Sequence, residues 1–167
     1  MTEQKILVIF YSLTGNTKFI AETMAKEIGA DLLELKPKNE IKARSFMKYF
    51  WGGKQVMMKE KPKLLPMDKN PNDYDLIFIG TPAWAWNYSP PLRSFFNQVK
   101  LRNKKIGLFC CHGGQIGKTL TKMKKELDGN VILGAMDFFE PLKNNPEKNT
   151  TLSAKWAKEI TAFYIPN

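Results

Sequence analysis

Short apolar runs alternate with segments of helical periodicity along the whole chain. We interpret five of the runs as strands: Lys5–Phe10, Asp31–Leu35, Leu76–Ile79, Lys105–Cys111 and Val131–Phe138. The first, third and fourth runs are continuous apolar stretches, which are typical of strands covered on both faces. Strands that alternate with helices indicate βαβ units around a parallel sheet. The pattern therefore predicts a doubly wound α/β fold.

The helices are predicted from apolar residues that recur at intervals of three or four positions. Ile20, Met24 and Ile28 form the stripe of the first helix, and Gly29 is placed to end it. Three later helices are expected: one from about Pro90 that buries Leu92, Phe95, Phe96 and Val99, one over about Ile116–Leu127, and one over about Ser153–Tyr164 that buries Trp156, Ile160 and Phe163. Lys143–Thr150 is predicted to be a polar connection.

The segment 41–69 is too long and too aromatic for a plain crossover helix. Aromatic and methionine side chains gather around Gly52 and Gly53: Phe46, Met47, Tyr49, Phe50, Trp51, Met57 and Met58. We predict that this segment is an insertion with its own helix. No repeat or linker interrupts the rest, so residues 1–167 are expected to form one domain.

Composition agrees with a single globular domain. The chain has 167 residues, of which 43% are hydrophobic and 25% are charged. No apolar run approaches the roughly 20 residues that span a bilayer, and Met1–Lys5 shows no signal-peptide pattern. We therefore expect a cytoplasmic protein without membrane insertion.

Cysteine and histidine are too few for a metal site or a disulfide framework. Cys110 and Cys111 are neighbours, and His112 is the only histidine. Apolar surroundings keep a thiol protonated, so Cys111 is not expected to react.

The formal net charge is +10, from 26 Lys and Arg against 16 Asp and Glu. Such a charge attracts anionic partners at low salt. Nucleic acid is not expected as a partner, because no recognition motif is present and the basic residues are spread over surface-like positions: Lys36, Lys54, Lys59, Lys63, Lys104, Lys122, Lys125 and Lys158. The charge instead favours dinucleotide phosphates, acidic quinones or acidic protein partners.

A phosphate site is predicted where the first strand gives way to the first helix. Its six residues are Ser12, Leu13, Thr14, Gly15, Asn16 and Thr17. Unpaired N–H groups and the positive end of the helix dipole favour a phosphate there, and the hydroxyls add donors. A helix cap alone would explain one or two of these residues, but not six in a row. The loop is neither a Walker A motif nor a dinucleotide fingerprint.

A second candidate loop follows the third strand and is rich in aromatic residues. Its candidate ligand-binding residues are Thr81, Pro82, Ala83, Trp84, Ala85 and Trp86. In a sheet ordered 2-1-3-4-5, strands one and three are adjacent, so this loop and the phosphate loop share one crevice. Trp84 or Trp86 is expected to stack on a planar ring system.

A third candidate loop follows the fourth strand and contributes Cys111, His112, Gly113, Gly114 and Gly117. Gly117-Lys118-Thr119 matches the end of a Walker A motif, but His112 stands where the motif needs its first glycine. Glycines suit a close approach of the backbone to a ligand. His112 is a weak candidate for a proton donor, and more often such a histidine only makes hydrogen bonds.

In their order along the chain, these loops and strands resemble the flavodoxin family over nearly the whole sequence. Thr81-Pro82-Ala83-Trp84-Ala85-Trp86 is similar to the corresponding loop of a bacterial branch of that family. The resemblance implies a three-layer flavodoxin-like fold, with a five-stranded parallel sheet in order 2-1-3-4-5 and helices on both faces. It also implies FMN as cofactor, bound by the three loops. Two features depart from the family: electron-carrying flavodoxins are typically acidic, and their second stacking tyrosine has no counterpart between Cys111 and Gly117.

Three functions remain open at this point. The first is a flavoprotein of electron transport that passes electrons to a redox partner protein. The second is an oxidoreductase, an NAD(P)H-dependent FMN reductase acting on quinone-like or other small acceptors. The third is a module that binds phosphorylated ligands without redox chemistry. The chain is expected to be a monomer or a homodimer.

Overall fold

A computed structural model describes residues 4–39 and 61–164. Its central sheet has the order β2-β1-β3-β5-β6, and every pairing along this path is parallel. These strands are β1 (Ile6–Phe10), β2 (Asp31–Glu34), β3 (Leu76–Trp84), β5 (Lys105–His112) and β6 (Val131–Phe139). The predicted order 2-1-3-4-5 is confirmed, with β5 and β6 as the fourth and fifth predicted strands. A short extra strand, β4 (Asn87–Tyr88), pairs antiparallel with β3 and was not predicted.

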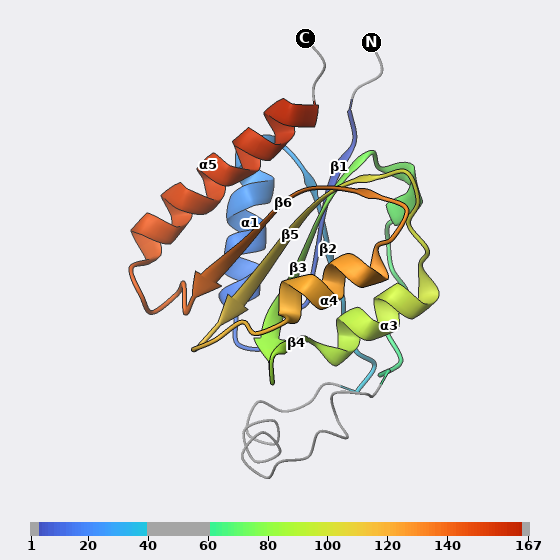
Figure 1. Cartoon of the computed structure of the whole chain (residues 1–167), viewed down its shortest axis with the longest axis horizontal. Coiled ribbons are helices and arrows are strands. Elements are labelled where there is room, and N and C mark those ends of the chain that lie inside the picture. Colours follow the sequence, from blue (N-terminus) through green and yellow to red (C-terminus); the bar gives the residue numbers. More distant parts are fainter. Residues whose placement is uncertain (1–3, 40–60, 165–167) are drawn as a thin grey trace.

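The helices cover both faces of the sheet, so the molecule has three layers (Figure 1). One layer contains α1 (Asn16–Ile28) and α5 (Pro146–Tyr164), and the other contains α3 (Pro90–Gln98) and α4 (Thr119–Glu126). A short 3₁₀ helix, η2 (Pro71–Asp73), precedes β3.

Successive side chains of each strand point to opposite faces of the sheet, so the core is divided into two clusters. Leu7 and Ile9 of β1 pack with the α3 and α4 layer, whereas Val8 and Phe10 pack with α1 and α5. All five residues of β1 are buried, because the strand lies between β2 and β3 and is covered on both faces. Burial of each such side chain contributes about 1.5–3 kcal/mol.

The first helix matches its prediction, because Gly29 ends α1 with φ 66°. α3 begins at the expected prolines but ends at Gln98, so Val99 lies just beyond it and is only partly buried. α4 is shorter than the predicted Ile116–Leu127. The last helix begins at Pro146 rather than near Ser153, because the side chain of Asn145 accepts a hydrogen bond from the Lys148 N–H at 3.1 Å.

Phe163 was predicted to be buried, and this prediction is wrong. Its side chain is 80% exposed, whereas Trp156 and Ile160 are buried as expected. Tyr164 rather than Phe163 lies four residues beyond Ile160 and packs against the same core cluster. The apolar stripe of α5 therefore continues through Tyr164.

Most of the predicted insertion at 41–69 lies outside the described residues. Residues 61–69 return beside the end of β2, where the Lys38 N–H donates to the Lys63 carbonyl at 2.7 Å and the Leu65 N–H donates to the Lys36 carbonyl at 2.8 Å. Leu64 between these bonds is buried. Among the helices that the structure describes, none is long and apolar enough to cross a bilayer.

Candidate functional site

Three loops meet at the carboxyl edge of the sheet, because β1, β3 and β5 are neighbours and run in the same direction (Figure 1). They are the phosphate loop 12–17, the turn between β3 and β4, and the loop 113–118 that follows β5. Contacts join the three loops. Tyr11 after β1 places its ring 5.7 Å from that of Trp84, edge to face. A β-carbon built on Gly117 would come within 2.4 Å of Trp86 Cβ.

The phosphate loop leads directly into α1 without a side-chain cap. Gly15 stands before the helix with φ 95°, a left-handed conformation that favours glycine. The Gly15 N–H donates to Ser12 Oγ at 3.2 Å, and the Asn16 side chain donates to Thr14 Oγ1 at 3.4 Å. No acidic residue lies in the first turn of α1. This end of the helix therefore offers N–H donors and a positive dipole end to an anion.

Thr17 carries a buried hydroxyl that lies beside the Cys111 thiol. The residue is 1% exposed, and apart from this weak contact with sulfur its hydroxyl has no hydrogen-bond partner in the described part of the chain. Such a group costs about 1–3 kcal/mol. An acceptor supplied by a ligand would remove this cost, so the donor set of the loop fits a phosphate.

Asn16 also connects this loop to the segment after β6. Its side-chain oxygen accepts a hydrogen bond from the Leu142 N–H at 3.1 Å, and Leu142 Cδ1 would lie 3.3 Å from a β-carbon on Gly15. Leu142 is 42% exposed. We did not predict its position from the sequence, since it lies far from Asn16 along the chain.

The aromatic loop forms a tight β-hairpin. Ala83 pairs with Tyr88 and Trp84 pairs with Asn87, so only Ala85 and Trp86 make the turn. Both turn residues have positive φ, 47° and 62°, as a type I′ turn requires. Asn and Gly usually occupy these positions, so alanine and tryptophan here hold local backbone strain.

The hairpin separates the two candidate tryptophans. Trp84 is 6% exposed and belongs to the core cluster on the α3 and α4 side, where it packs on Tyr11. Trp86 is 62% exposed at the tip of the turn. Of the two side chains, Trp86 is therefore the one available to a ligand at the surface.

Hydrogen bonds hold the base of the hairpin in place. The Ser89 N–H donates to Thr81 Oγ1 at 3.0 Å, and the two side-chain hydroxyls lie 3.1 Å apart. Tyr88 donates its hydroxyl proton to Glu126 of α4 at 2.7 Å. Burial and this bond raise the pKa of Tyr88 above its ordinary value. The hairpin is thus fastened to α4.

At the end of β5, His112 is held by Asp137, which is not among the predicted site residues. Its Nε2 lies 2.9 Å from Asp137 Oδ2 on the neighbouring strand β6. Its Nδ1 is buried and, in the described residues, has no hydrogen-bond partner. The ring also packs at 5.8 Å from that of Phe139. Asp137 could have been suggested by its polar side chain within an apolar strand.

The glycines of the loop after β5 differ in their roles. Gly117 has φ 51° and touches Trp86, so a side chain is excluded there. Gly113 and Gly114 are exposed, and a β-carbon on Gly114 would meet nothing within 4 Å. Gly114 therefore leaves open space over the loop, whereas a β-carbon on Gly113 would lie 3.6 Å from Glu140 Oε1.

The remaining candidate residues lie deeper. Thr81 and Cys111 are almost fully buried. Burial raises the pKa of the Cys111 thiol to about 12, although the nearby Thr17 hydroxyl lowers it slightly, and burial also raises the pKa of Cys110. Both thiols are therefore protonated at neutral pH. Within the described ranges, no group of three acidic, cysteine or histidine side chains is arranged to hold a metal ion.

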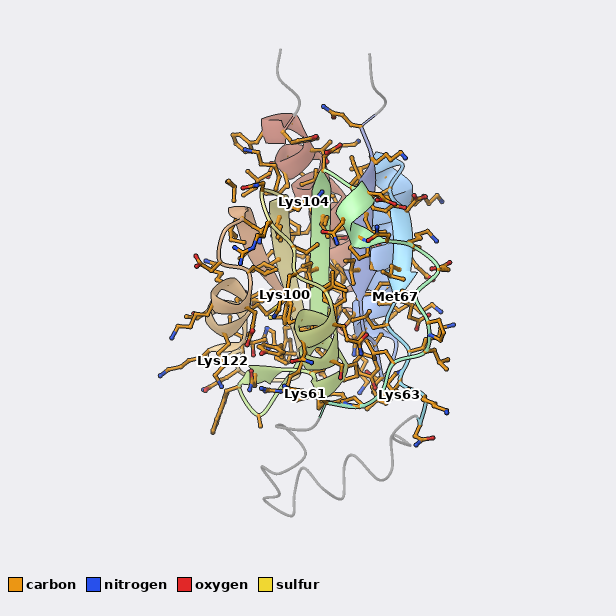
Figure 2. The ribbon with its side chains drawn as sticks, turned by 90° about the vertical axis from the view of Figure 1, so that its right-hand side faces the viewer. Lys61, Lys63, Met67, Lys100, Lys104 and Lys122 are labelled. Atoms are coloured by element: carbon orange, nitrogen blue, oxygen red, sulfur yellow. The ribbon has the colours of Figure 1, made fainter. Side chains whose placement is uncertain are left out.

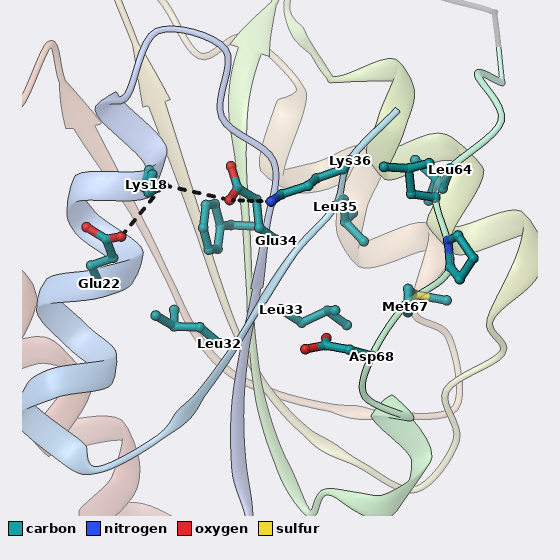
Figure 3. Close-up of a pocket in the computed structure, with 13 residues that line it drawn as sticks. Lys18, Glu22, Leu32, Leu33, Glu34, Leu35, Lys36, Leu64, Met67 and Asp68 are labelled. Atoms are coloured by element: carbon teal, nitrogen blue, oxygen red, sulfur yellow. Dashed lines mark ion pairs between the residues drawn. The ribbon is translucent and has the colours of Figure 1, made fainter. Parts of the chain in front are cut away.

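A cavity of about 350 Å³ lies elsewhere, beside β2 and the segment 64–68 (Figure 3). Lys18 pairs there with Glu22 at 3.9 Å and with Glu34 at 3.8 Å. None of the predicted cofactor-binding residues lines it. The charges at its wall are already compensated within the protein, so we do not assign it to the site.

The sheet order, the phosphate loop after β1 and the two loops after β3 and β5 define a flavodoxin-like α/β protein. A sequence model of the family described as flavodoxin matches residues 5–140. The chain therefore belongs to the flavodoxin family.

Solved structures and a sequence relative agree with this assignment. The chain is 25% identical to a candidate flavoprotein from Bacteroides eggerthii, with a TM-score of 0.74 over 95% of this chain and 99% of that one. It is 24% identical to a flavoprotein from Lactobacillus acidophilus solved in complex with FMN, with a TM-score of 0.63 over 84% and 97% of the two chains. An uncharacterized protein of Archaeoglobus fulgidus is 25% identical over 154 residues, which cover 89% of this chain and 96% of that protein.

Proposed function

We propose that this protein binds FMN at the carboxyl edge of its sheet and transfers electrons through it. The observation that carries the proposal is the uncapped amino-terminal end of α1. Gly15 stands directly before the helix, the first turn has no acidic residue, and the buried Thr17 hydroxyl has no hydrogen-bond partner in the described part of the molecule apart from the weak contact with the Cys111 thiol. A phosphate would satisfy these donors. The similar Lactobacillus acidophilus flavoprotein binds FMN, which supports the same ligand here.

The other two loops are suited to a planar ring. Trp86 presents a large exposed aromatic surface beside Gly117, and an aromatic face stacks on a ring system and excludes water from it. The exposed backbone at Gly114 leaves room at the edge of such a ring. Bound FMN would supply a group that accepts and releases electrons. The protein supplies the phosphate donors, the stacking surface and a fixed orientation.

A reductase is the second candidate, and the position of Trp84 favours it. Because Trp84 is buried in the core, Trp86 is the one tryptophan of the aromatic loop that can cover a ring. An uncovered ring face would admit a nicotinamide and then a small acceptor. An anaerobic titration of the FMN-loaded protein with NADH and NADPH separates the two functions. Loss of the yellow absorbance with either nucleotide indicates a reductase, whereas no reaction until dithionite is added indicates an electron carrier.

FMN binding itself is tested by comparing FMN with riboflavin, which lacks the phosphate. Flavin fluorescence should be quenched by the apoprotein, and FMN should bind at least tenfold more tightly than riboflavin. Thr17→Val should weaken FMN binding by roughly 10- to 150-fold, because a hydrogen bond to a charged group contributes about 1.5–3 kcal/mol. The same change should leave riboflavin binding unaltered.

A matched control is available on the same helix. Thr23 donates its hydroxyl proton to the Phe19 carbonyl at 2.8 Å, so Thr23→Val removes a hydroxyl from α1 without touching the phosphate loop. It should not change FMN affinity. Equal affinities for FMN and riboflavin would contradict the phosphate site. Binding of inorganic phosphate or a sugar phosphate without any flavin binding would instead support the module that binds phosphorylated ligands.

A further inference from the structure

The positive charge of this protein is distributed unevenly between its two helical layers. In the layer of α1 and α5 the charges are nearly balanced: α1 has two lysines and two glutamates, and α5 has three lysines and two glutamates. Several are paired, as in Lys155–Glu159 at 3.9 Å and Lys158–Glu27 between the two helices. This layer therefore has little net charge to offer a partner.

The layer of α3 and α4 is more basic: α3 has one arginine and no acidic residue, α4 has three lysines and one glutamate, and lysines of neighbouring segments lie on the same side. We define the basic face as six lysines, of which Figure 2 labels the first five: Lys61, Lys63, Lys100, Lys104, Lys122 and Lys125. None of the six forms an ion pair with another residue that the structure describes. The charge of this face is therefore not compensated from within the described chain.

The contacts that these lysines do make are with neutral groups. Lys61 donates to the Asn97 side chain at 3.1 Å, Lys100 to the Phe96 carbonyl at 2.8 Å, and Lys104 to the Asn72 carbonyl at 2.6 Å. Such bonds orient the ammonium groups without neutralising them. The one acidic residue within α4, Glu126, accepts the hydroxyl proton of Tyr88.

The α4 part of the basic face, with Lys122 and Lys125, adjoins the candidate redox site, whereas Lys104 lies toward the amino edge of the sheet. The Tyr88–Glu126 bond ties α4 to the β3–β4 hairpin, and the exposed Trp86 lies at the tip of that hairpin. The segment before α4 contributes Gly117, which touches Trp86. A molecule held on α4 would therefore lie close to the edge at which we place the flavin.

We propose that the basic face docks an acidic electron-transfer protein, which exchanges electrons with the flavin near Trp86. This inference rests on the proposed function for the electron transfer, but the docking rests on the charge distribution alone. Lysines with solvated ammonium groups suit a weak, salt-dependent encounter that steers a partner of opposite charge. Electron-transfer complexes are small and transient interfaces of this kind.

A nucleic acid is the less favoured partner. Phosphate recognition favours the planar fork of arginine, whereas lysines outnumber the arginines of this layer, Arg93 on α3 and Arg102 between Lys100 and Lys104. The residues of the basic face are also distributed over the segment before β3, the ends of α3 and β5, and α4, rather than along one helix or loop. The basic face also repels basic proteins, so it selects its partner by the sign of the partner's charge.

The test uses an acidic plant-type [2Fe–2S] ferredoxin as the partner probe. Its binding to the FMN-loaded and the FMN-free protein is measured by a fluorescence titration, and its electron exchange with the flavin by stopped-flow absorbance. We expect both the affinity and the second-order rate constant to fall about tenfold or more when ionic strength rises from low to physiological. Basic cytochrome c should show no such decrease.

Two double variants distinguish the effect of charge on the basic face from the effect of the net charge of the whole protein. Lys122→Glu with Lys125→Glu changes α4, and Lys148→Glu with Lys155→Glu makes the same change of charge on α5. At low salt the α4 variant should lose about tenfold or more in the rate constant and in affinity, whereas the α5 variant should lose less than about threefold. The milder pair Lys122→Gln with Lys125→Gln should give an intermediate loss, and it guards against misfolding of the glutamate variant.

Three results would overturn the proposal. Equal losses in the α4 and α5 variants would mean that net charge alone attracts the partner. Tighter binding of a DNA duplex than of ferredoxin at the same salt, lost in the same α4 variant, would assign the face to nucleic acid. Absence of ferredoxin binding to either form at low salt would reject the docking surface. If the protein binds ferredoxin but never FMN, the proposed function fails while the docking surface stands.

Discussion

The strained turn of the β3–β4 hairpin allows stability and flavin binding to be separated. Ala85 and Trp86 both have positive φ, where a side chain costs about 1–2 kcal/mol relative to glycine. Glycine relieves this cost but loses about 0.5–1 kcal/mol of backbone entropy on folding. The balance predicts that glycine at either position stabilises the apoprotein by about 0.5–1 kcal/mol, since little burial is lost at the exposed Trp86.

The two substitutions should differ in their effect on the ligand. Ala85→Gly relieves the turn and keeps the indole, so FMN affinity should remain within about twofold of that of the parent protein. Trp86→Gly removes the stacking surface as well. Stacking of an aromatic pair contributes about 0.5–1.5 kcal/mol beyond simple burial, so FMN should bind roughly three- to tenfold more weakly.

Urea and thermal unfolding of the apoprotein measure the effect on stability, and a fluorescence titration with FMN measures the effect on binding. For a chain of this size, the melting temperature should rise by about 1–4 °C in both variants. A decrease in the stability of Ala85→Gly by more than about 0.5 kcal/mol would refute the strain in the turn. Unchanged FMN affinity in Trp86→Gly would remove the indole from the proposed site.

Three further predictions follow from the packing. Gly117→Ala should lower the free energy of unfolding by about 1–3 kcal/mol, because the new β-carbon would meet Trp86 and the residue has a positive φ. Gly114→Ala should change the free energy of unfolding by less than about 0.5 kcal/mol. Thermal unfolding compares the two variants, and equal effects would contradict the close contact at Gly117. Burial, with a 2.7 Å hydrogen bond to Asp31, raises the pKa of Tyr74 to about 12. Its contribution to stability is therefore present below about pH 10 and is lost as the pH rises toward 12. Tyr74→Phe should reduce the dependence of the unfolding free energy on pH over that range, and an unchanged dependence would exclude Tyr74 as its cause. Because the pKa values of both thiols are raised, iodoacetamide at pH 8 should modify neither Cys110 nor Cys111 in the folded protein. Both thiols should react in urea, and mass spectrometry measures the modification. Rapid labelling without urea would contradict the burial of the two side chains.

The strands and the phosphate loop were predictable because their signals are local. A continuous apolar run such as that of β1 indicates a strand covered on both faces, and parallel strands joined by helices allow few arrangements. Ser12–Thr17 combine glycine, hydroxyls and a helix start within six neighbouring residues. The order of the sheet and the position of this loop therefore followed from the pattern.

Other features depend on contacts between distant residues or on small differences in energy. The start of α5 depends on a capping bond from Asn145, and a shift of one residue exchanges Phe163 for Tyr164 at the core. The pair His112–Asp137 forms because β5 and β6 are adjacent, although 25 positions separate the two residues. A periodic pattern does not contain these pairings.

The sequence by itself determined the class of fold, the sheet order and the candidate phosphate site, because hydrophobic periodicity and helix-end chemistry act over a few neighbouring residues. Only the tertiary structure decided which tryptophan is exposed, since Ala85 and Trp86 adopt a turn that their own preferences disfavour. It also decided that six lysines without an ion pair in the described chain gather on the side of α3 and α4. Composition gives the total charge, whereas the charge on each face depends on which residues the fold brings together.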